Sequence, residues 1–171
     1  MSRFGGFLVI SLALAAATSG AMAQGGRSPT ESAVILGPSP YDLSGTGTGF
    51  AVNAGIAVPV VRQVLILEPS LGVFTYSSQF GNRTHWLFPE LSLQAQTRLG
   101  GVRPYLGGGI GAGTTGLSGP ARWQVTLHGV AGMRVHVGGR WGVRGEMRLR
   151  SVDPFHGNTV DLGIGVTRRS F

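Results

Sequence analysis

The stretch that decides the fold is WLFPELSLQAQTRL, which runs from Trp86 to Leu99. Apolar and polar side chains alternate along it every two residues, which is the spacing at which the side chains of a β-strand point to opposite faces. One face carries Leu87, Leu91, Leu93, Ala95 and Leu99, and the other carries Glu90, Ser92, Gln94, Gln96 and Arg98. The stretch therefore predicts a strand with one apolar and one polar face.

The same alternation recurs on both sides of this stretch. It covers residues 50–58, 65–76, 102–114, 123–137, 141–150 and 160–167. An eighth strand is expected at about 31–43, where Pro38 and Pro40 predict an irregular or partly edge-like course, because proline cannot donate to a strand ladder. Eight strands of this kind, joined in sequence order, predict an all-β, antiparallel, up-and-down barrel.

The connections between these strands alternate in length. Tight turns are expected at Val61-Arg62, at Gly100-Gly101 and at 138–140, and longer connections at 77–85, 116–122 and 153–158. Transmembrane barrels have short turns on the periplasmic side and longer loops outside. An even number of strands would place both chain ends on the side of the short turns.

The first 23 residues predict an export signal. Arg3 precedes the apolar run from Phe7 to Ala17, and the small-residue motif Ala21-Met22-Ala23 predicts cleavage before Gln24. An N-terminal membrane anchor is the alternative, but the apolar run is too short to span a bilayer. We expect residues 1–23 to be a signal peptide and residues 24–171 to form one barrel domain, located in an outer membrane.

Composition narrows the classes of protein further. Every later apolar segment is interrupted well before the roughly 18 residues of a transmembrane helix, so any membrane span must be a strand. The absence of cysteine excludes disulfides, thiolate metal sites and lipid attachment through an N-terminal cysteine. Fourteen basic residues, all arginine, face seven acidic ones, but the arginines alternate with apolar residues and follow an export signal. We therefore expect no binding to nucleic acid.

A membrane explains why the strands should close into a barrel. The bilayer core offers no water to backbone polar groups, so a β-structure there must pair all of its strands. At eight strands the interior is just wide enough to be filled by side chains. Glycines at 107, 109, 111 and 113 either make room for inward groups such as Phe74 and Tyr76 or bend the strand. Trp86, Trp123 and Trp141 lie near strand ends, which suits interfacial girdles, with aromatic core packing as the alternative.

The polar faces supply both signs of charge to this interior. The expected lumen charge network consists of Glu68, Glu90, Arg98, Arg103, Arg134, Arg144, Glu146, Arg148, Arg150 and Asp161. If the ladder follows the turns, Arg150 lies near Asp161, and Arg148 lies near Glu146. The set has about two positive charges in excess, and these should lie near the wet ends, because an unpaired buried ion costs several kcal/mol.

The chain also resembles a known family. The signal peptide, the run Arg103-Pro104-Tyr105-Leu106-Gly107-Gly108-Gly109-Ile110-Gly111, the Gly145-Glu146 strand and the terminal Phe171 look like the outer-membrane β-barrel domain family. That superfamily includes small eight-stranded barrels of the OmpA and OmpW type, and the resemblance covers nearly all of residues 24–171. The terminal Phe implies recognition by the outer-membrane assembly machinery. Arg169, Thr167 and Gly165 depart from the family's terminal pattern, which has hydrophobic residues at these alternate positions.

Candidate catalytic and metal-binding residues are few. Some small barrels are lipid A deacylases with a His and Ser pair, and only the segment with Ser151, Asp153, His156 and Asn158 invites that comparison, with Asn158 where a Ser would be needed. His128 and His136 share an inward face but lie about 26 Å apart at strand rise, and His85 is expected in a loop. We expect no enzyme activity, no cofactor and no metal.

Three hypotheses about function remain. The first is a structural or interaction barrel, a monomer with slight small-solute passage at most, in contact with outer-membrane lipid and lipopolysaccharide. The second is a lipid A modifying barrel enzyme. The third is a soluble, periplasmic, lipocalin-like barrel, in which the apolar faces would point inward. Bulky Leu, Val and Trp residues on one face, against glycines and polar residues on the other, favour lipid outside and a narrow filled lumen.

Overall fold

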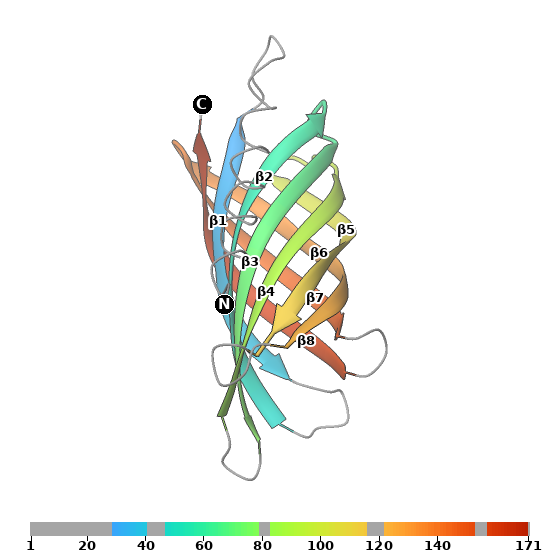
Figure 1. The fold of residues 1–171 in the computed structure, drawn as a ribbon. Helices are drawn as coiled ribbons and strands as arrows, with labels where there is room; N and C mark the ends of the chain where they lie inside the picture. Colours follow the sequence, from blue (N-terminus) through green and yellow to red (C-terminus); the bar gives the residue numbers. More distant parts are fainter. Residues whose placement is uncertain (1–28, 41–46, 79–82, 116–121, 153–156, 171) are drawn as a thin grey trace.

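The strands of the chain close into a barrel (Figure 1). The computed structural model describes residues 29–40, 47–78, 83–115, 122–152 and 157–170. The strands in these ranges are β1 (Thr30–Pro40), β2 (Gly47–Val61), β3 (Leu65–Ser78), β4 (Arg83–Gln96), β5 (Val102–Thr114), β6 (Trp123–Gly138), β7 (Trp141–Val152) and β8 (Gly157–Ser170). All neighbours pair antiparallel in sequence order, so the predicted eight-stranded up-and-down barrel is confirmed. The predicted signal peptide, 1–23, lies outside the described residues.

The barrel is closed by β1 and β8. Their register runs from Thr30 opposite Ser170 to Leu36 opposite Ile164, so neither strand presents an unpaired edge along this length. Pro38 and Pro40 follow the last residue of β1 that pairs with β8, and there β1 pairs with β2 alone. The partly edge-like end predicted from the two prolines is therefore present, and the strand ends at Pro40.

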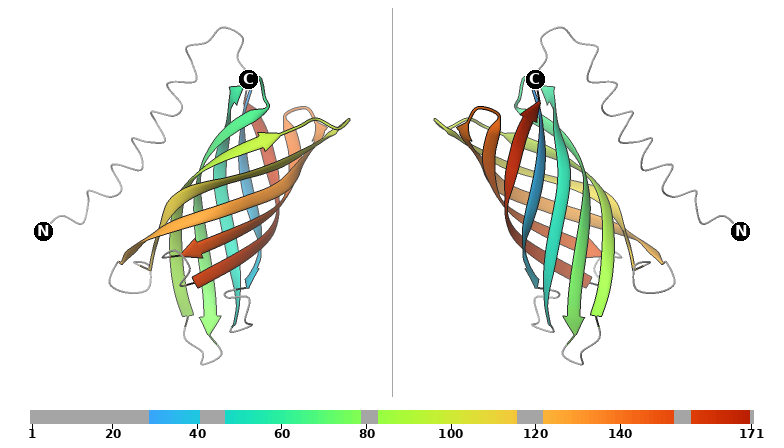
Figure 2. Two further views of the ribbon diagram at one scale, coloured as in Figure 1. Left: turned by 90° about the vertical axis from the view of Figure 1, so that its right-hand side faces the viewer. Right: turned by 90° about the vertical axis from the view of Figure 1, so that its left-hand side faces the viewer.

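The two ends of the barrel differ. The turn end carries the tight turns at residues 62–64, 97–101 and 139–140 together with the start of β1 and the end of β8, and the loop end is the opposite one (Figure 2). Gly100 and Gly139 have φ of 60° and 55°, a backbone conformation that costs glycine little. Arg62 and Gln63 have φ of 41° and 62°, the positive values that two-residue hairpin turns of type I′ require.

Apolar side chains cover the outside of the barrel. On β4, Leu91 and Leu93 are 43% and 48% exposed, while the alternate residues Ser92 and Gln94 are fully buried. Arg144 on β7 is 1% exposed. An apolar surface this continuous is not found on a soluble monomer. The lipocalin-like alternative, with apolar residues inside, is therefore wrong.

The tryptophans divide between the two surfaces. Trp123 and Trp141 are more than half exposed on the outer surface, the first at the start of β6 by the loop end and the second at the start of β7 by the turn end. Trp86 points inward and stacks on Phe88, with ring centroids 5.8 Å apart. An outer girdle position is wrong for Trp86, because its even number gives it the inward parity of Phe88 and Glu90 on β4. His85 was expected in a loop and instead lies within β4.

The inward glycines of β5 make room for side chains and for the neighbouring strand. A Cβ at Gly113 would lie 2.6 Å from the ring of Phe88, and one at Gly109 would lie 2.8 Å from the ring of His128. Cβ atoms at Gly107 and Gly109 would also collide with the carbonyl oxygens of Leu93 and Leu91 on β4. The first reason predicted for this glycine row, room for inward groups, therefore applies, with Phe88 and His128 as the groups, and close approach of β4 is an additional reason.

Candidate functional site

The centre of the lumen is built mainly by β7. Its inward positions are Arg144, Glu146, Arg148 and Arg150, and each is at most 8% exposed. Because side chains alternate across a strand, the sequence WGVRGEMRLR places every one of these charges on one face. Carboxylates from β3 and β4 face them across the lumen, and Asp161 of the neighbouring strand β8 lies beside them.

Glu68 of β3 forms ion pairs with the first group of arginines. Arg144 donates to both of its oxygens, from Nη1 to Oε2 at 2.7 Å and from Nη2 to Oε1 at 2.9 Å. Arg134 of β6 donates from Nη2 to Oε2 at 3.1 Å, and Nη2 of Arg148 lies 3.6 Å from Oε1. Two parallel bonds from one guanidinium fix the orientation of both groups, so Glu68 joins β3 to β6 and β7.

Glu90 of β4 receives the second group. Arg150 donates from Nε to Oε1 at 2.6 Å and from Nη2 to Oε2 at 3.0 Å, and Arg148 donates from Nη1 to Oε2 at 2.7 Å. Arg150 also forms an ion pair with Asp161 of β8 and a bond of 2.8 Å to Asn53 of β2. Arg150 therefore connects four strands from one buried position.

Glu146 and Tyr105 complete the centre. Glu146 pairs with Arg144 and with Arg148, whose Nη2 lies 2.9 Å from Oε1. The Tyr105 hydroxyl donates to Glu146 Oε2 at 2.6 Å and accepts from Arg144 Nε at 2.7 Å. The guanidiniums of Arg134 and Arg144 lie 4.3 Å and 4.8 Å from the centroid of the Tyr105 ring, within the range of cation–π attraction.

This central network is balanced in charge. It holds four guanidiniums, on Arg134, Arg144, Arg148 and Arg150, and four carboxylates, on Glu68, Glu90, Glu146 and Asp161. Burying a charge is tolerated only when it is paired and its remaining hydrogen-bonding positions are filled. Equal numbers and repeated bidentate contacts meet that condition for most of the network, with Nε of Arg134 as a buried donor that forms no hydrogen bond among the described residues.

An apolar layer lies between this network and the loop end. Phe74, Phe88, Ala51 and Val152 are buried against one another, and Tyr76 and Trp86 pack on them. The guanidinium of Arg150 lies 4.9 Å from the centroid of the Phe88 ring, which joins the apolar layer to the charges. The lumen, as far as the structure describes it, is thus filled by side chains from the loop end to its centre.

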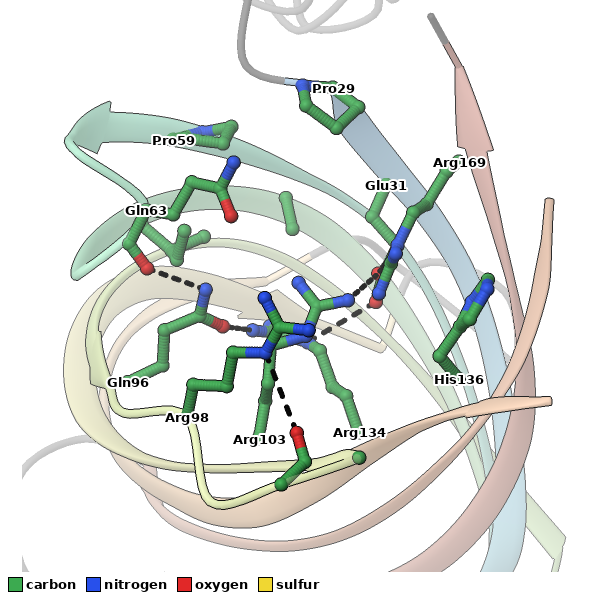
Figure 3. A pocket seen from close by; sticks show the side chains of 14 residues that line it. Pro29, Glu31, Pro59, Gln63, Gln96, Arg98, Arg103, Arg134, His136 and Arg169 are labelled. Atoms are coloured by element: carbon green, nitrogen blue, oxygen red, sulfur yellow. Dashed lines mark hydrogen bonds and ion pairs between the residues drawn. The ribbon is translucent and has the colours of Figure 1, made fainter. Parts of the chain in front are cut away.

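The turn end is different, because a cavity of about 370 Å³ opens there. Figure 3 shows Arg98, Arg103, Arg134 and Arg169 converging on it together with Glu31. Glu31 Oε2 lies 3.3 Å from Nε of Arg169 and 4.0 Å from Nη2 of Arg103, and its Oε1 lies 3.4 Å from Nε of Arg134. The side chains of Arg103 and Arg169 remain 18% and 20% exposed, so the cavity is in contact with solvent.

Two glutamines, Gln94 and Gln96, bind Arg134 at the inner end of this cavity. Arg134 donates from Nη1 to Gln96 Oε1 at 2.6 Å and from Nη2 to Gln94 Oε1 at 2.7 Å. Gln96 in turn donates from Nε2 to the backbone oxygen of Gln63, in the turn after β2, at 2.6 Å. Arg134 therefore belongs to both the central network and the cavity.

Eight of the ten residues expected in the lumen network lie in the central network. Arg150 contacts Asp161, and Arg148 contacts Glu146. Arg103 lies at the turn end, with Glu31 as its carboxylate. Arg98 lies beyond the end of β4 at Gln96, where its exposed side chain lines the turn-end cavity and donates to the backbone oxygen of Gly100 at 3.4 Å. The two arginines outside the central network thus lie near solvent, as expected of the charges in excess.

Sequence reasoning missed several members of this lumen. Glu31, a fifth carboxylate, was overlooked because its strand was expected to be irregular, and Arg169 because it lies next to the chain end. Tyr105 and Asn53 were assigned to inward faces but not to the network. The signal that could have found all four is the inward parity of their strands.

One buried contact has the composition of a hydrolase triad. Ser92 Oγ lies 2.7 Å from His128 Nε2, and His128 Nδ1 lies 3.4 Å from Glu90 Oε1. Ser92 is fully buried, and the arginines already occupy Glu90, so a substrate has no access to this serine. The arrangement serves packing in the lumen.

The described part of the chain offers little else to catalysis or to metals. It contains no group of three His, Asp or Glu side chains that could hold a metal ion, and no helix long and apolar enough to cross a membrane. Asp153 and His156 of the segment compared with a deacylase lie outside the described residues, while Ser151 and Asn158 face each other across β7 and β8.

Comparisons with known proteins agree on the fold. No protein-family model and no curated protein sequence matches the chain. Among solved structures, the Neisserial surface protein NspA is similar at a TM-score of 0.64 and 14% identity, over 81% of this chain and 96% of that one. The N-terminal barrel domain of Pseudomonas aeruginosa OprF is similar at a TM-score of 0.58 and 13% identity, over 83% of this chain and 97% of that one.

The outer membrane enzyme PagL is similar too, at a TM-score of 0.57 and 13% identity over 81% of this chain and 98% of that one. These neighbours include both enzymes and proteins not described as enzymes, and at such low identity they establish architecture alone. The expected resemblance is confirmed at that level: the chain has the fold of the small, eight-stranded, outer-membrane β-barrels.

Proposed function

We propose that this chain is an outer-membrane protein that crosses the bilayer with its turn end toward the periplasm. Residues 1–23 would direct export and be removed, and residues 24–171 would form the barrel. The apolar outer surface supports lipid contact, and Trp123 and Trp141 lie at the two levels where aromatic girdles occur. The tight turns lie at the same end of the barrel as the start of β1 and the end of β8, as in barrels with periplasmic turns.

The proposed role is structural or interactive, without conduction through the barrel. The observation that carries this proposal is the filled lumen: Arg144, Arg148 and Arg150 are 1–2% exposed and lie in a balanced ion-pair network. The apolar layer around Phe74 and Phe88 supports the same conclusion at the loop end. A channel would need a continuous polar path past both layers.

The partners of such a barrel would lie at its loop end. Arg83 at the start of β4 and Arg122 just before β6 are exposed there, and guanidiniums pair well with the phosphates of lipopolysaccharide. The protein is proposed to work as a monomer and to be inserted by the outer-membrane assembly machinery. It is proposed to need no cofactor and to bind no nucleic acid.

We also propose that the chain is not an enzyme. The similarity to PagL concerns architecture, and the buried Ser92–His128 pair cannot reach a lipid on the outside. Expressing the protein in a lipopolysaccharide-producing host should leave the mass of lipid A unchanged. A loss of one acyl chain that disappears in a Ser151→Ala or His156→Ala variant would establish the deacylase alternative instead.

The main test combines localisation with conductance. The protein should fractionate with outer membranes and should migrate differently on gels before and after boiling, as a folded barrel does. Purified into a planar bilayer, it should give no stable conductance steps under conditions in which an open porin does. Release into the soluble periplasmic extract would contradict the membrane proposal, and regular conductance steps would contradict the sealed lumen.

A further inference from the structure

The cavity at the turn end contains more positive charge than its surroundings neutralise. The central network is complete with four arginines and four carboxylates. Outside it, three arginines, Arg98, Arg103 and Arg169, line the cavity together with one carboxylate, Glu31, which pairs with Arg103 and Arg169. Among the described residues the cavity therefore has an excess of two positive charges.

The three arginines also have unused donors. Arg98 has no carboxylate partner among the described residues, and its recorded bond is a long one of 3.4 Å to Gly100. Arg103 reaches Glu31 only at 4.0 Å, and Arg169 only through Nε at 3.3 Å. A guanidinium has five N–H donors, so most donors of these three groups are available to a ligand.

Part of the cavity wall is held in place by buried contacts. Glu31 and Arg134 are 6% and 3% exposed, and Gln96 ties Arg134 to the turn at Gln63. The volume of about 370 Å³ is at the low end of the range of about 300–1,000 Å³ usual for ligand pockets. The lining mixes charged and polar side chains with apolar ones such as Pro59 and Ile66, and it is open to solvent on one side.

We propose that the turn-end cavity binds a small, doubly charged oxyanion of the phosphate class through Arg98, Arg103 and Arg169. Two negative charges would cancel the excess on the cavity wall, and the planar guanidinium fork matches a tetrahedral oxyanion with two parallel bonds. Glu31 acts as the internal competitor, because it pairs with two of these guanidiniums, those of Arg103 and Arg169, when the ligand is absent. The ligand reaches the site from the side of the tight turns, either as a free anion or as the headgroup of a lipid.

The test is a titration of inorganic phosphate into the full-length barrel, purified in a phosphate-free maltoside detergent at low salt and followed by calorimetry. Binding should be one to one, and it should weaken as sodium chloride is added, since part of the attraction is screened. The double substitution Arg98→Gln with Arg103→Gln should lower the affinity on the order of tenfold or more, since charge-assisted hydrogen bonds are lost.

The chain provides a matched control at the neighbouring position. Arg168 precedes Arg169 but points outward, with its guanidinium 5.7 Å from the centroid of the Trp141 ring, so Arg168→Gln removes one positive charge outside the cavity, against the two that the double variant removes inside it. The affinity of the Arg168→Gln variant for phosphate should stay within about twofold of wild type, because a charge outside the cavity acts on the ligand only at long range, where salt screens it. Glu31→Gln should bind phosphate more tightly than wild type.

The outcomes separate cleanly. No binding by the wild-type barrel, equal losses in Arg168→Gln and the double variant, or weaker binding by Glu31→Gln would each overturn the proposal. Each variant must keep the heat-dependent gel shift of the folded barrel, so that a loss is not caused by misfolding. In nanodiscs, phosphatidic acid, whose phosphomonoester can carry two negative charges, in place of phosphatidylcholine should reduce phosphate binding if a lipid headgroup is the source, and unchanged binding indicates a free anion. Conductance does not enter this test, so it stands apart from the proposed function.

Discussion

The middle of the lumen and its turn end use the same residue, arginine, in two different ways. In the middle, Arg144 and Arg148 are 1% exposed, and they contact two and three carboxylates respectively. At the turn end, Arg103 and Arg169 keep about a fifth of their side-chain surface and share the single carboxylate of Glu31. The first arrangement is complete without a ligand, and the second is not.

The difference shows that burial decides what a charge can do. A guanidinium deep in the barrel must be paired within the protein, because the lumen there offers it no water, so it holds strands together. One near the mouth can be paired by solvent or by a ligand, so its loss should cost little stability. Substitutions at different depths should separate these two roles.

The largest effect is expected in the middle. Glu68→Ala removes the carboxylate shared by Arg134, Arg144 and Arg148 and leaves buried positive charges unpaired, which should lower the free energy of unfolding by about 3–5 kcal/mol. Urea unfolding in lipid vesicles, followed by tryptophan fluorescence, measures the change. A loss below about 1 kcal/mol would be too small for an unpaired buried charge and would contradict the structural role of the network.

An arginine placed on the outer surface of the barrel extends the comparison between the middle of the lumen and its turn end. Leu93→Arg places a guanidinium on the outer face of β4, where Leu93 is 48% exposed, and should cost about 2–4 kcal/mol in a bilayer. Leu99→Arg, beside the tight turn after β4, is the control and should cost about 0–1 kcal/mol, because the penalty falls toward the interface. Equal costs measured by the same unfolding assay would mean that Leu93 does not lie deeper in the bilayer.

Close packing of the lumen predicts a smaller effect. Gly109→Ala would place its Cβ 2.8 Å from the His128 ring and against the backbone of β4, which should cost about 1–3 kcal/mol. Gly129→Ala is the matched control, since a Cβ there meets nothing within 4 Å. Unfolding of both variants in urea measures the difference, and equal stability would argue that the lumen is loosely filled.

The smallest effect is expected at the turn end. Arg103→Gln removes the ion pair between Arg103 and Glu31, which spans 4.0 Å and is partly exposed to solvent. Pairs of this kind contribute about 0–1 kcal/mol to stability. The unfolding midpoint of this variant should lie close to that of wild type in the same assay. A loss as large as that of Glu68→Ala would mean that the cavity arginines belong to the structural network.

The architecture could be predicted from sequence because alternation carries it. A period of two residues assigns each side chain to a face, so the inward positions of Glu90, Arg144 and Asp161 follow once the strands are located. Closure follows as well, because strands with an apolar outer face need all backbone groups paired in lipid. Even the effect of Pro38 and Pro40 on β1 could be anticipated from the missing N–H.

The details of the lumen could not be predicted in the same way. Alternation does not say where a strand stops, so Arg98 was placed in the network although β4 ends at Gln96. It also does not say which side chains meet across the lumen, and the contacts of Tyr105 with Arg144 and of Asn53 with Arg150 depend on register between distant strands. Trp86 is a different case, since its nearness to a strand end suggested a girdle although the alternation itself gave the inward position.

The most direct test of the account uses the absence of native cysteine. Single cysteines at Leu91, Ser92, Leu93 and Gln94, each spin-labelled in lipid vesicles, report whether a side chain meets the bilayer or the lumen. We predict that labels at 91 and 93 collide readily with oxygen dissolved in the lipid, while labels at 92 and 94 are shielded from it. The opposite alternation, or no alternation at all, would contradict a barrel whose apolar faces meet lipid and whose charges seal the interior.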